Sequence, residues 1–493
     1  MSDSNYKEGL KGTSIFGSVG IFNIIITVIK SKLIAVFLGP EGMGILGLFN
    51  SATNLILSIS NLGLRTSAVK DISEANATGD INTISRVAYV FKRLVWLTGW
   101  LGTGLFILAS PFISKSSFGN YDYIPQLILL SFFLLFSQLL DGTNVLMQGT
   151  RRLKDLAFSN LLGSLISLIC VVPLYYFWGI GSIAPTIVLG IFIQYAVSYY
   201  YSHKIQLQKV TVSLKECLIE GKGMVKLGFF IALNSVFTSL SAYIIRSFIS
   251  NVNGIVDVGL YTAGFNIVIA YTGIVFNAMA TEYYPRLASF SSDNNRVSSA
   301  VNSQVELTIT LVAPLVCLFL VFGNFAVLLL YSDKFLGCTW MINFAMIGMF
   351  FKSPGWCLGY VFLAKGDSKA FFYNEIATLV FSTLCNMLFY YKWGLTGLGI
   401  SYIVIYFVYW MQQLVVCRWL YKYSFDVKVL KAVAPHFMIA LLCCWLMVQG
   451  FIPQLYVYLI GGLFVLISCY ISYLNLQRNV DIKGFIQSKF FKK

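Results

Sequence analysis

Basic side chains occur inside long apolar segments of this 493-residue chain. Lys30 and Lys32 lie toward the end of the first apolar segment, Arg246 has the corresponding place in the seventh, and Lys352 lies midway along the tenth. Arg65 follows the second segment directly. A charge at the centre of a membrane raises the free energy of insertion by about 2.5–3.5 kcal/mol, so each of these positions needs a reason.

The first segment places its polar side chains on one helix face. Asn23, Thr27 and Lys30 are spaced by four and three residues and form a stripe, whereas Lys32 points roughly 200° away from Lys30. The structural alternative for both lysines is snorkelling to the membrane interface near Pro40. Snorkelling explains why long side chains are tolerated at this end of the segment. It does not explain why both of them are basic. Both lysines are therefore candidates for ligand binding.

Acidic side chains are scarcer in these segments. Asp141 in the fourth segment shares a helix face with Gln138, and its carboxylate can either neutralise a nearby cation or bind a coupling proton or Na⁺. Because the candidate cations outnumber the candidate carboxylates, the sequence favours an anionic ligand. Phosphate fits, because Lys and Arg make charge-assisted hydrogen bonds to its oxygens and its binding offsets their desolvation.

Membrane-spanning helices must hold these side chains. The chain is 57% hydrophobic and only 11% charged, whereas a soluble domain has about 25% charged residues. Its apolar stretches are long enough to cross roughly 30 Å of hydrocarbon as helices. We predict an all-α polytopic membrane protein of about fourteen transmembrane helices, near residues 14–38, 43–64, 87–110, 125–147, 156–177, 180–202, 223–250, 257–282, 303–331, 336–364, 370–391, 396–418, 431–450 and 453–475.

The gaps between these spans alternate in charge. One set of gaps is rich in Lys and Arg, and the other holds little beyond Lys115, Lys334 and Lys392. Cytoplasmic loops carry the excess of Lys and Arg, so the basic gaps and both termini are predicted to be cytoplasmic. The net charge of +15 then reflects membrane topology, and no nucleic-acid partner is predicted.

The two halves of the chain resemble each other at a nearly constant offset. Tyr175-Tyr176-Phe177-Trp178-Gly179 recurs 215 positions later as Tyr390-Tyr391-Lys392-Trp393-Gly394, and Gly47-Leu48-Phe49 recurs as Gly259-Leu260-Tyr261. Gly149 and Gly366 mark corresponding basic turns. Because the offset spans six helices, both halves enter the membrane in the same direction.

The repeat predicts two pseudo-symmetric six-helix lobes around a central cavity, with two appended C-terminal helices. The expected domains are an N-terminal lobe (1–202), a basic amphipathic cytoplasmic linker (203–222), a C-terminal lobe (223–420), and helices 13 and 14 with a basic cytoplasmic tail (421–493).

Neither metal nor disulfide chemistry is predicted. The ten cysteines are scattered, mostly inside spans and without CxxC spacing, which favours packing roles. His203 and His436 show no ligand spacing. The first span lacks the pattern of a cleaved signal peptide, so we expect it to be retained.

The end of the first span carries an extended motif, Lys32-Leu33-Ile34-Ala35-Val36-Phe37-Leu38-Gly39-Pro40-Glu41-Gly42-Met43-Gly44, followed by Asn61-Leu62-Gly63-Leu64 and Ser67-Ala68-Val69-Lys70-Asp71-Ile72. This motif resembles bacterial O-antigen translocases. They are lipid-linked oligosaccharide flippases of the multidrug/oligosaccharidyl-lipid/polysaccharide exporter superfamily. The length, the topology and the twelve-plus-two duplication extend the resemblance over essentially the whole chain.

The resemblance implies a function in lipopolysaccharide or polysaccharide biosynthesis. The protein would move undecaprenyl-pyrophosphate-linked O-antigen or polysaccharide repeat units from the cytoplasmic to the periplasmic leaflet of the bacterial inner membrane, by alternating access. Cations of a V-shaped cavity would bind the pyrophosphate. The substrate-binding candidates are Asn23, Lys30, Lys32, Arg65, Arg246 and Lys352, and Asp141 is the candidate for coupling-ion binding or charge balance.

The same resemblance sets the expected ligands and partners. No cofactor is expected, and H⁺, Na⁺ or the membrane potential are the candidate sources of energy. The expected partners are a polyprenyl-pyrophosphate-linked oligosaccharide and membrane lipids, with other polysaccharide-assembly proteins as an open addition.

Two alternatives remain open at this point. An H⁺- or Na⁺-coupled multidrug or organic-cation exporter of the same superfamily needs deep carboxylates, for which Asp141 is the only good candidate. A membrane enzyme of polysaccharide assembly (a polymerase, ligase or glycosyltransferase) needs convergent acid and base groups outside the membrane. The sequence has no large outer loop, no DxD motif and no His–carboxylate cluster, so we predict a transporter rather than an enzyme.

Overall fold

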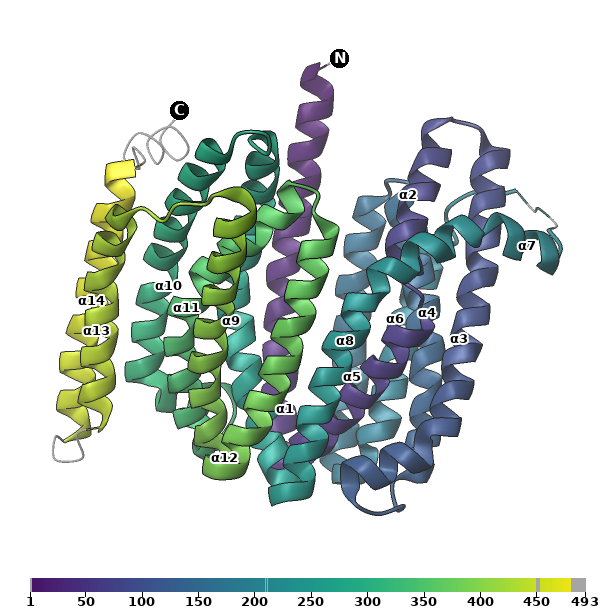
Figure 1. The fold of residues 1–493 in the computed structure, drawn as a ribbon. Helices are drawn as coiled ribbons and strands as arrows, with labels where there is room; N and C mark the ends of the chain where they lie inside the picture. The colour runs from purple at the N-terminus through teal and green to yellow at the C-terminus, as the bar shows by residue number, and fades with distance from the viewer. Residues whose placement is uncertain (1, 209, 211, 449–452, 480–493) are drawn as a thin grey trace, which may run out of the picture. The chain divides into compact units, whose positions relative to one another are not determined.

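The computed structural model describes residues 2–208, 210, 212–448 and 453–479. Every regular element in this part of the chain is a helix (Figure 1). A chain in lipid has to pair its backbone N–H and C=O groups internally, and a helix does so within one segment. The predicted all-α fold is confirmed. Most of the predicted basic tail lies outside the described residues.

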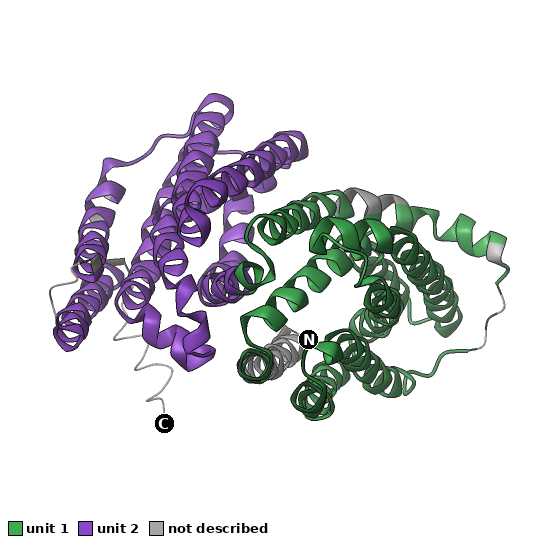
Figure 2. Ribbon diagram, turned by 90° about the horizontal axis from the view of Figure 1, so that it is seen from below, with its two compact units in different colours: residues 1–259 green, residues 260–493 purple. Residues whose placement is uncertain are grey.

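The chain forms two compact units, Met1–Gly259 and Leu260–Lys493 (Figure 2). We call them unit 1 and unit 2. The elements of unit 1 are α1 (Ser2–Ser60), α2 (Leu64–Ala77), α3 (Ile81–Phe118), α4 (Ile124–Gly149), α5 (Leu153–Trp178), η1 (Gly179–Ser182), α6 (Ile183–Ser202), α7 (Leu214–Glu220) and α8 (Lys222–Asn253).

Unit 2 begins within the second turn of α9 (Ile255–Ser289). Its other elements are α10 (Asn294–Leu330), η2 (Asp333–Cys338), α11 (Thr339–Ala364), α12 (Ser368–Tyr421), α13 (Val427–Val448) and α14 (Gln454–Asn479). Helices α13 and α14 both pack against α10, so the two appended spans belong to this unit.

The predicted number of spans is confirmed. Ten helical stretches among the described residues are long and apolar enough to cross a membrane. Three of them hold two predicted spans each: α1 bends at Gly39, η1 separates α5 from α6, and α12 is broken at Trp393 and Gly394. Helix α8 covers the seventh predicted span. All fourteen predicted spans therefore correspond to helices.

The predicted repeat is visible in the backbone dihedral angles. Three pairs of residues with positive φ lie 215 positions apart, and each pair falls in corresponding turns between spans. The pairs are Gly39 (φ 64°) with Gly254 (φ 94°), Arg151 (φ 58°) with Gly366 (φ 70°), and Gly179 (φ 54°) with Gly394 (φ 58°). Glycine adopts this conformation readily because it has no Cβ, which explains five of the six residue types.

Gly149 and Gly366 mark corresponding turns, as predicted, but the residue that matches Gly366 in conformation is Arg151. Gly149 is the last helical residue of α4, and a side chain there would collide with Ile72 of α2. Arg151 takes the left-handed conformation instead. Gly149 thus allows close helix packing, and the turn is made two residues later.

The first helix of the second predicted lobe packs in unit 1. Helix α8 contacts α1, α2 and α3. The backbone of Gly63, between α1 and α2, lies against the backbone of Gly228 on α8. The lobes were assigned from the repeat, whereas the units are defined by contacts, so the predicted lobe boundaries and the linker at 203–222 stay a prediction.

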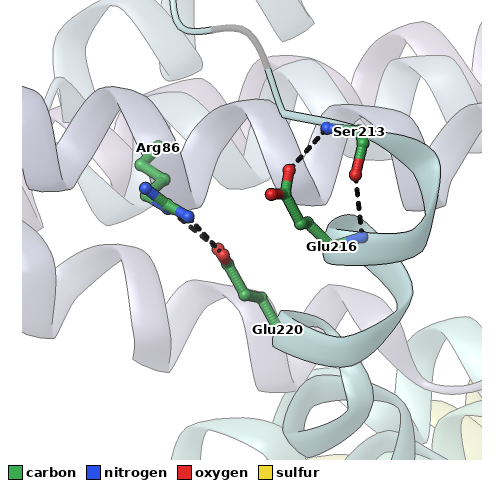
Figure 3. A network of polar contacts seen from close by, with 4 residues as sticks. All are labelled: Arg86, Ser213, Glu216 and Glu220. Carbon is green, nitrogen blue, oxygen red and sulfur yellow. Dashed lines mark hydrogen bonds and ion pairs between the residues drawn. The ribbon is translucent and has the colours of Figure 1, made fainter.

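The segment 203–222 contains a short helix, α7, whose ends are fixed by polar contacts (Figure 3). The Ser213 hydroxyl accepts a hydrogen bond from the Glu216 backbone N–H (3.2 Å), and the Glu216 carboxylate accepts one from the Ser213 N–H (2.8 Å), which is a capping box. Arg86 of α3 pairs with Glu220 through Nη2–Oε1 (2.6 Å) and Nε–Oε2 (3.1 Å). The hydrogen bond from Arg86 lowers the pKa of the Glu220 carboxyl, so the pair stays ionised at neutral pH.

Helix α2 was not predicted. Its buried residues Leu64, Ala68, Ile72 and Ala75 are spaced by four, four and three residues, so they lie on one helix face. The sequence therefore contained the helical period, but the charged residues around it favoured a loop.

We predict that Arg86→Gln increases the exposure of Cys217, the buried thiol of α7. Loss of the bidentate pair removes the side-chain link between α3 and the end of α7. Maleimide labelling followed by peptide mass spectrometry should show faster modification of Cys217. Arg152→Gln, which removes a pair with Asp155 elsewhere in unit 1, is the matched control and should leave the rate unchanged. Equal rates in both variants would contradict the prediction.

Candidate functional site

Lys30 lies on the face of α1 that packs into unit 1. It is spaced four residues from Ile26 and from Ile34, which are 9% and 4% exposed, and Lys30 itself is half-buried. No carboxylate of the described residues lies within ion-pair distance of its Nζ atom. The helix thus holds this ammonium group among apolar side chains without a counter-ion from the described part of the chain.

Lys32 lies on the opposite, exposed face of the same helix. It is spaced seven residues from Ile25 and four from Val36, which are 47% and 50% exposed. Lys32 itself is half-buried, as Lys30 is, so the two lysines differ in their neighbours along the helix and not in their own exposure. The function of each lysine stays a prediction.

Asn23 lies on the same stripe of the helix as Lys30, as predicted. Its backbone carbonyl accepts a hydrogen bond from the Thr27 hydroxyl (2.8 Å). The side-chain Oδ1 of Asn23 is buried, and no group of the described residues donates a hydrogen bond to it. A buried acceptor of this kind raises the free energy of the folded state unless a ligand or water satisfies it.

Arg246 is positioned by the end of α8, which is bound to α3. The Tyr243 hydroxyl shares hydrogen bonds with Ser116 (2.6 Å) and Ser117 (3.0 Å), and Ser117 also bonds to Ser247 (3.1 Å). Arg246 is half-buried, and its Nη1 donates to the Ala242 carbonyl (3.3 Å). The residues on both sides of Arg246 are thus fixed to a neighbouring helix, which limits the movement of the guanidinium group.

Lys352 belongs to unit 2, where aromatic rings hold its charge. Its Nζ lies 5.0 Å from the centroid of the Phe276 ring on α9 and 5.3 Å from that of Tyr406 on α12. Cation–π contacts of this kind are worth about 0.5–2 kcal/mol, more where water is excluded. No carboxylate of the described residues pairs with Lys352. The rings stabilise the cation while its N–H donors stay available to an anion.

Arg65 and Asp141 form an ion pair in unit 1. The Nη1 of Arg65 on α2 lies 3.1 Å from Oδ1 of Asp141 on α4, and the side chains are 60% and 26% exposed. Two roles were left open for Asp141. The structure supplies a partner for one of them, charge balance, because Arg65 is the cation that it neutralises. Arg65 is correspondingly engaged by a protein carboxylate.

The structure brings some of the predicted residues together. Arg65 and Asp141 are in contact. Lys30 and Lys32 lie on α1 before its bend at Gly39, and Arg246 lies on α8. Lys352 lies in the other unit. The sequence analysis missed Phe276 and Tyr406, because aromatic residues make up 16% of the chain and a single ring carries no signal of its position in space.

The fold is that of known transporters. It is similar to an inward-facing multidrug resistance MATE family transporter of the MOP superfamily (TM-score 0.68, 16% identity, 83% of this chain and 99% of that chain). It is also similar to the lipid II flippase MurJ in an inward closed conformation (TM-score 0.70, 13% identity, 94% of this chain and 99% of that chain). At such identities the likeness shows the fold alone.

Residues 33–340 match the polysaccharide biosynthesis protein family, and the chain belongs to this family. The lipid III flippase of Escherichia coli (strain K12) is 23% identical over 388 residues, which is 77% of this chain and 90% of that protein. The succinoglycan biosynthesis transport protein ExoT of Rhizobium meliloti (strain 1021) is 22% identical over 352 residues, 70% of this chain and 65% of that protein. These relatives are named as flippases and transport proteins, in agreement with a transporter rather than an enzyme.

We predict that Arg65 and Asp141 stabilise each other in unit 1. Arg65→Gln leaves a largely buried carboxylate without its partner, so it should lower thermal stability in detergent more than Asp141→Asn does, because the amide carries no charge to desolvate. A double-mutant cycle should give a coupling free energy of about 1 kcal/mol or less, since Arg65 is well exposed. The cycle Lys70→Gln with Glu74→Gln serves as an exposed reference pair, because these two side chains are 61% and 67% exposed. Additive effects of the two substitutions would show that the contact contributes nothing.

Proposed function

We propose that this protein is a flippase for a lipid-linked oligosaccharide. The substrate is a polyprenyl-pyrophosphate-linked repeat unit of O-antigen or of a related polysaccharide, moved by alternating access from the cytoplasmic to the periplasmic leaflet of the inner membrane. Family membership and relatives named as a lipid III flippase and a succinoglycan transport protein support this proposal. The observation that carries it is Lys30, a half-buried cation in the first span with no ion pair among the described residues.

The proposed role of the cations is to replace water around the pyrophosphate. The headgroup carries several negative charges, and its transfer away from water is unfavourable unless cations and donors surround it. Lys30 and Arg246 in unit 1 and Lys352 in unit 2 are the proposed primary ligands. The polyprenyl chain needs no protein cavity, because the membrane already solvates it.

Three further residues have smaller proposed roles. Lys32 lies on the exposed face of α1, Asn23 offers a buried side-chain oxygen, and Arg65 already pairs with a carboxylate. We propose that Asp141 balances the charge of Arg65 and does not bind a coupling ion. The energy for transport then comes from H⁺, Na⁺ or the membrane potential acting at other groups.

We predict that Lys30→Gln, Arg246→Gln and Lys352→Gln each lower export about ten-fold or more. A hydrogen bond to a charged group is worth about 1.5–3 kcal/mol, and 1.4 kcal/mol corresponds to a factor of ten. The assay is the rate of surface polysaccharide formation in a strain that lacks its own flippase and makes the matching glycan, with membrane insertion measured in parallel. Accumulation of the lipid-linked oligosaccharide should rise as export falls.

The controls separate charge from packing. Lys30→Arg and Lys352→Arg keep the cation and should retain most export, and Lys334→Gln, an exposed cation of unit 2, should have no effect. Unchanged export in all three Gln variants would contradict binding of the pyrophosphate by these cations. A wild-type protein that is inserted, restores no polysaccharide, and instead raises resistance to cationic drugs would support the multidrug exporter.

A further inference from the structure

A hollow of about 690 Å³ lies in unit 1, and none of the candidate transport residues lines it. Helix α4 forms its floor with Gly142, Thr143 and Leu146, and α3 and α6 form its walls. The segment after α6 closes one end, where the Gln208 backbone N–H donates to the Ser85 hydroxyl of α3 (2.9 Å). The hollow is therefore enclosed by three helices and by part of the predicted linker.

A second, smaller hollow of about 360 Å³ adjoins the first. The two share Tyr89, Lys92 and Trp96 of α3, and the smaller one adds Arg93. Lys92 thus lies where the two hollows meet. No Asp or Glu occurs among the residues that line either hollow. Lys92 is exposed and forms no ion pair with any residue that the structure describes.

The depth of these residues in the membrane follows from the sequence of α3. No charged residue occurs between Leu94 and Ser114, a stretch of 21 residues. At 1.5 Å per residue it covers roughly 31 Å, which is about the thickness of the hydrocarbon core. Lys92 and Arg93 therefore lie at one boundary of the hydrocarbon and Lys115 at the other. The charge distribution predicts that the Lys92 boundary is cytoplasmic.

The lining becomes more apolar along the hollow in the same direction. The aqueous end has a mixed lining of polar residues (Ser85, Gln206, Gln208) and apolar ones (Phe91, Leu207), whereas Val95, Trp96 and Leu139 line the part within the hydrocarbon boundary. The Arg93 guanidinium donates to the Tyr89 hydroxyl (2.9 Å) and lies over the Tyr89 ring (5.3 Å), which fixes that cation at the rim. A ligand that matches has a negatively charged polar end and an apolar end.

We propose that this hollow is a binding site for an anionic phospholipid of the cytoplasmic leaflet. The phosphate lies at Lys92 and Arg93, and one acyl chain lies between α3 and α6 against the α4 floor. A simple interfacial lysine needs no hollow behind it, whereas here a hollow lined by Val95, Trp96 and Leu139 continues from the cation into the membrane. The site is separate from the proposed transport cations, and the inference does not depend on the flippase proposal.

The test is native mass spectrometry of the purified full-length protein with added phosphatidylglycerol or phosphatidylcholine. We expect one phosphatidylglycerol molecule to bind more tightly than phosphatidylcholine. Lys92→Gln should weaken that binding about five-fold, the effect of about 1 kcal/mol for a basic residue near an anionic membrane surface. Leu146→Trp, which fills the hollow and keeps every charge, should abolish it.

Lys154→Gln is the matched control, because Lys154 is an exposed cation at the start of α5 that lines neither hollow. It should bind phosphatidylglycerol as the wild type does. Equal retention of the two lipids, or equal weakening by Lys92→Gln and Lys154→Gln, would overturn the proposal. Competition by millimolar inorganic phosphate at full strength would also overturn it, because it would show a site for free phosphate and not for a lipid. Thermal unfolding of each variant confirms that the compared proteins are folded.

Discussion

The structure depends on one constraint: inside a membrane, each backbone N–H and C=O has to find its partner within the protein. Continuous helices satisfy that constraint, and interruptions are tolerated where the chain turns at the membrane surface. Four glycine breaks follow this rule. Gly39, Gly179, Gly254 and Gly394 take positive φ at the ends of spans, where water can satisfy the unpaired groups.

The spacing of these breaks records the duplication more clearly than the side chains do. Side chains facing lipid can be exchanged among many apolar residues, so matches between them fade. A turn that requires positive φ accepts few residue types, so the position of the turn is kept. Arg151 shows that the conformation is retained even where the residue is not glycine, since it adopts a φ of 58° opposite Gly366. The repeat is therefore clearer in the backbone conformation than in the identity of the side chains.

A charged side chain inside a membrane also needs a partner within the protein, and the chain supplies such partners in three ways. Arg65 is neutralised by Asp141, the charge of Lys352 lies over two aromatic rings, and Arg246 donates to a backbone carbonyl of its own helix. Neutralisation by a carboxylate leaves little attraction for a second anion. Aromatic rings stabilise a cation without cancelling its charge, so Lys352 keeps its affinity for a phosphate group. The distinction separates Lys352, which is proposed to bind substrate, from Arg65, whose charge is balanced by a protein carboxylate.

The sequence predicted the helices well because hydrophobic length and the positions of Lys and Arg are local properties. It predicted which residues are chemically unusual, since a charge in an apolar span is visible without a structure. It could not predict their partners, because the contacts of Arg65 with Asp141 and of Lys352 with Phe276 and Tyr406 join distant parts of the chain. Lys92 shows the same limit of the sequence. Its position at a span boundary is typical of an ordinary topogenic cation. Only the packing of α3, α4 and α6 shows that a hollow lies behind it. A charge at the membrane surface is therefore ambiguous in sequence, and the volume beside it decides between an anchor and a binding site.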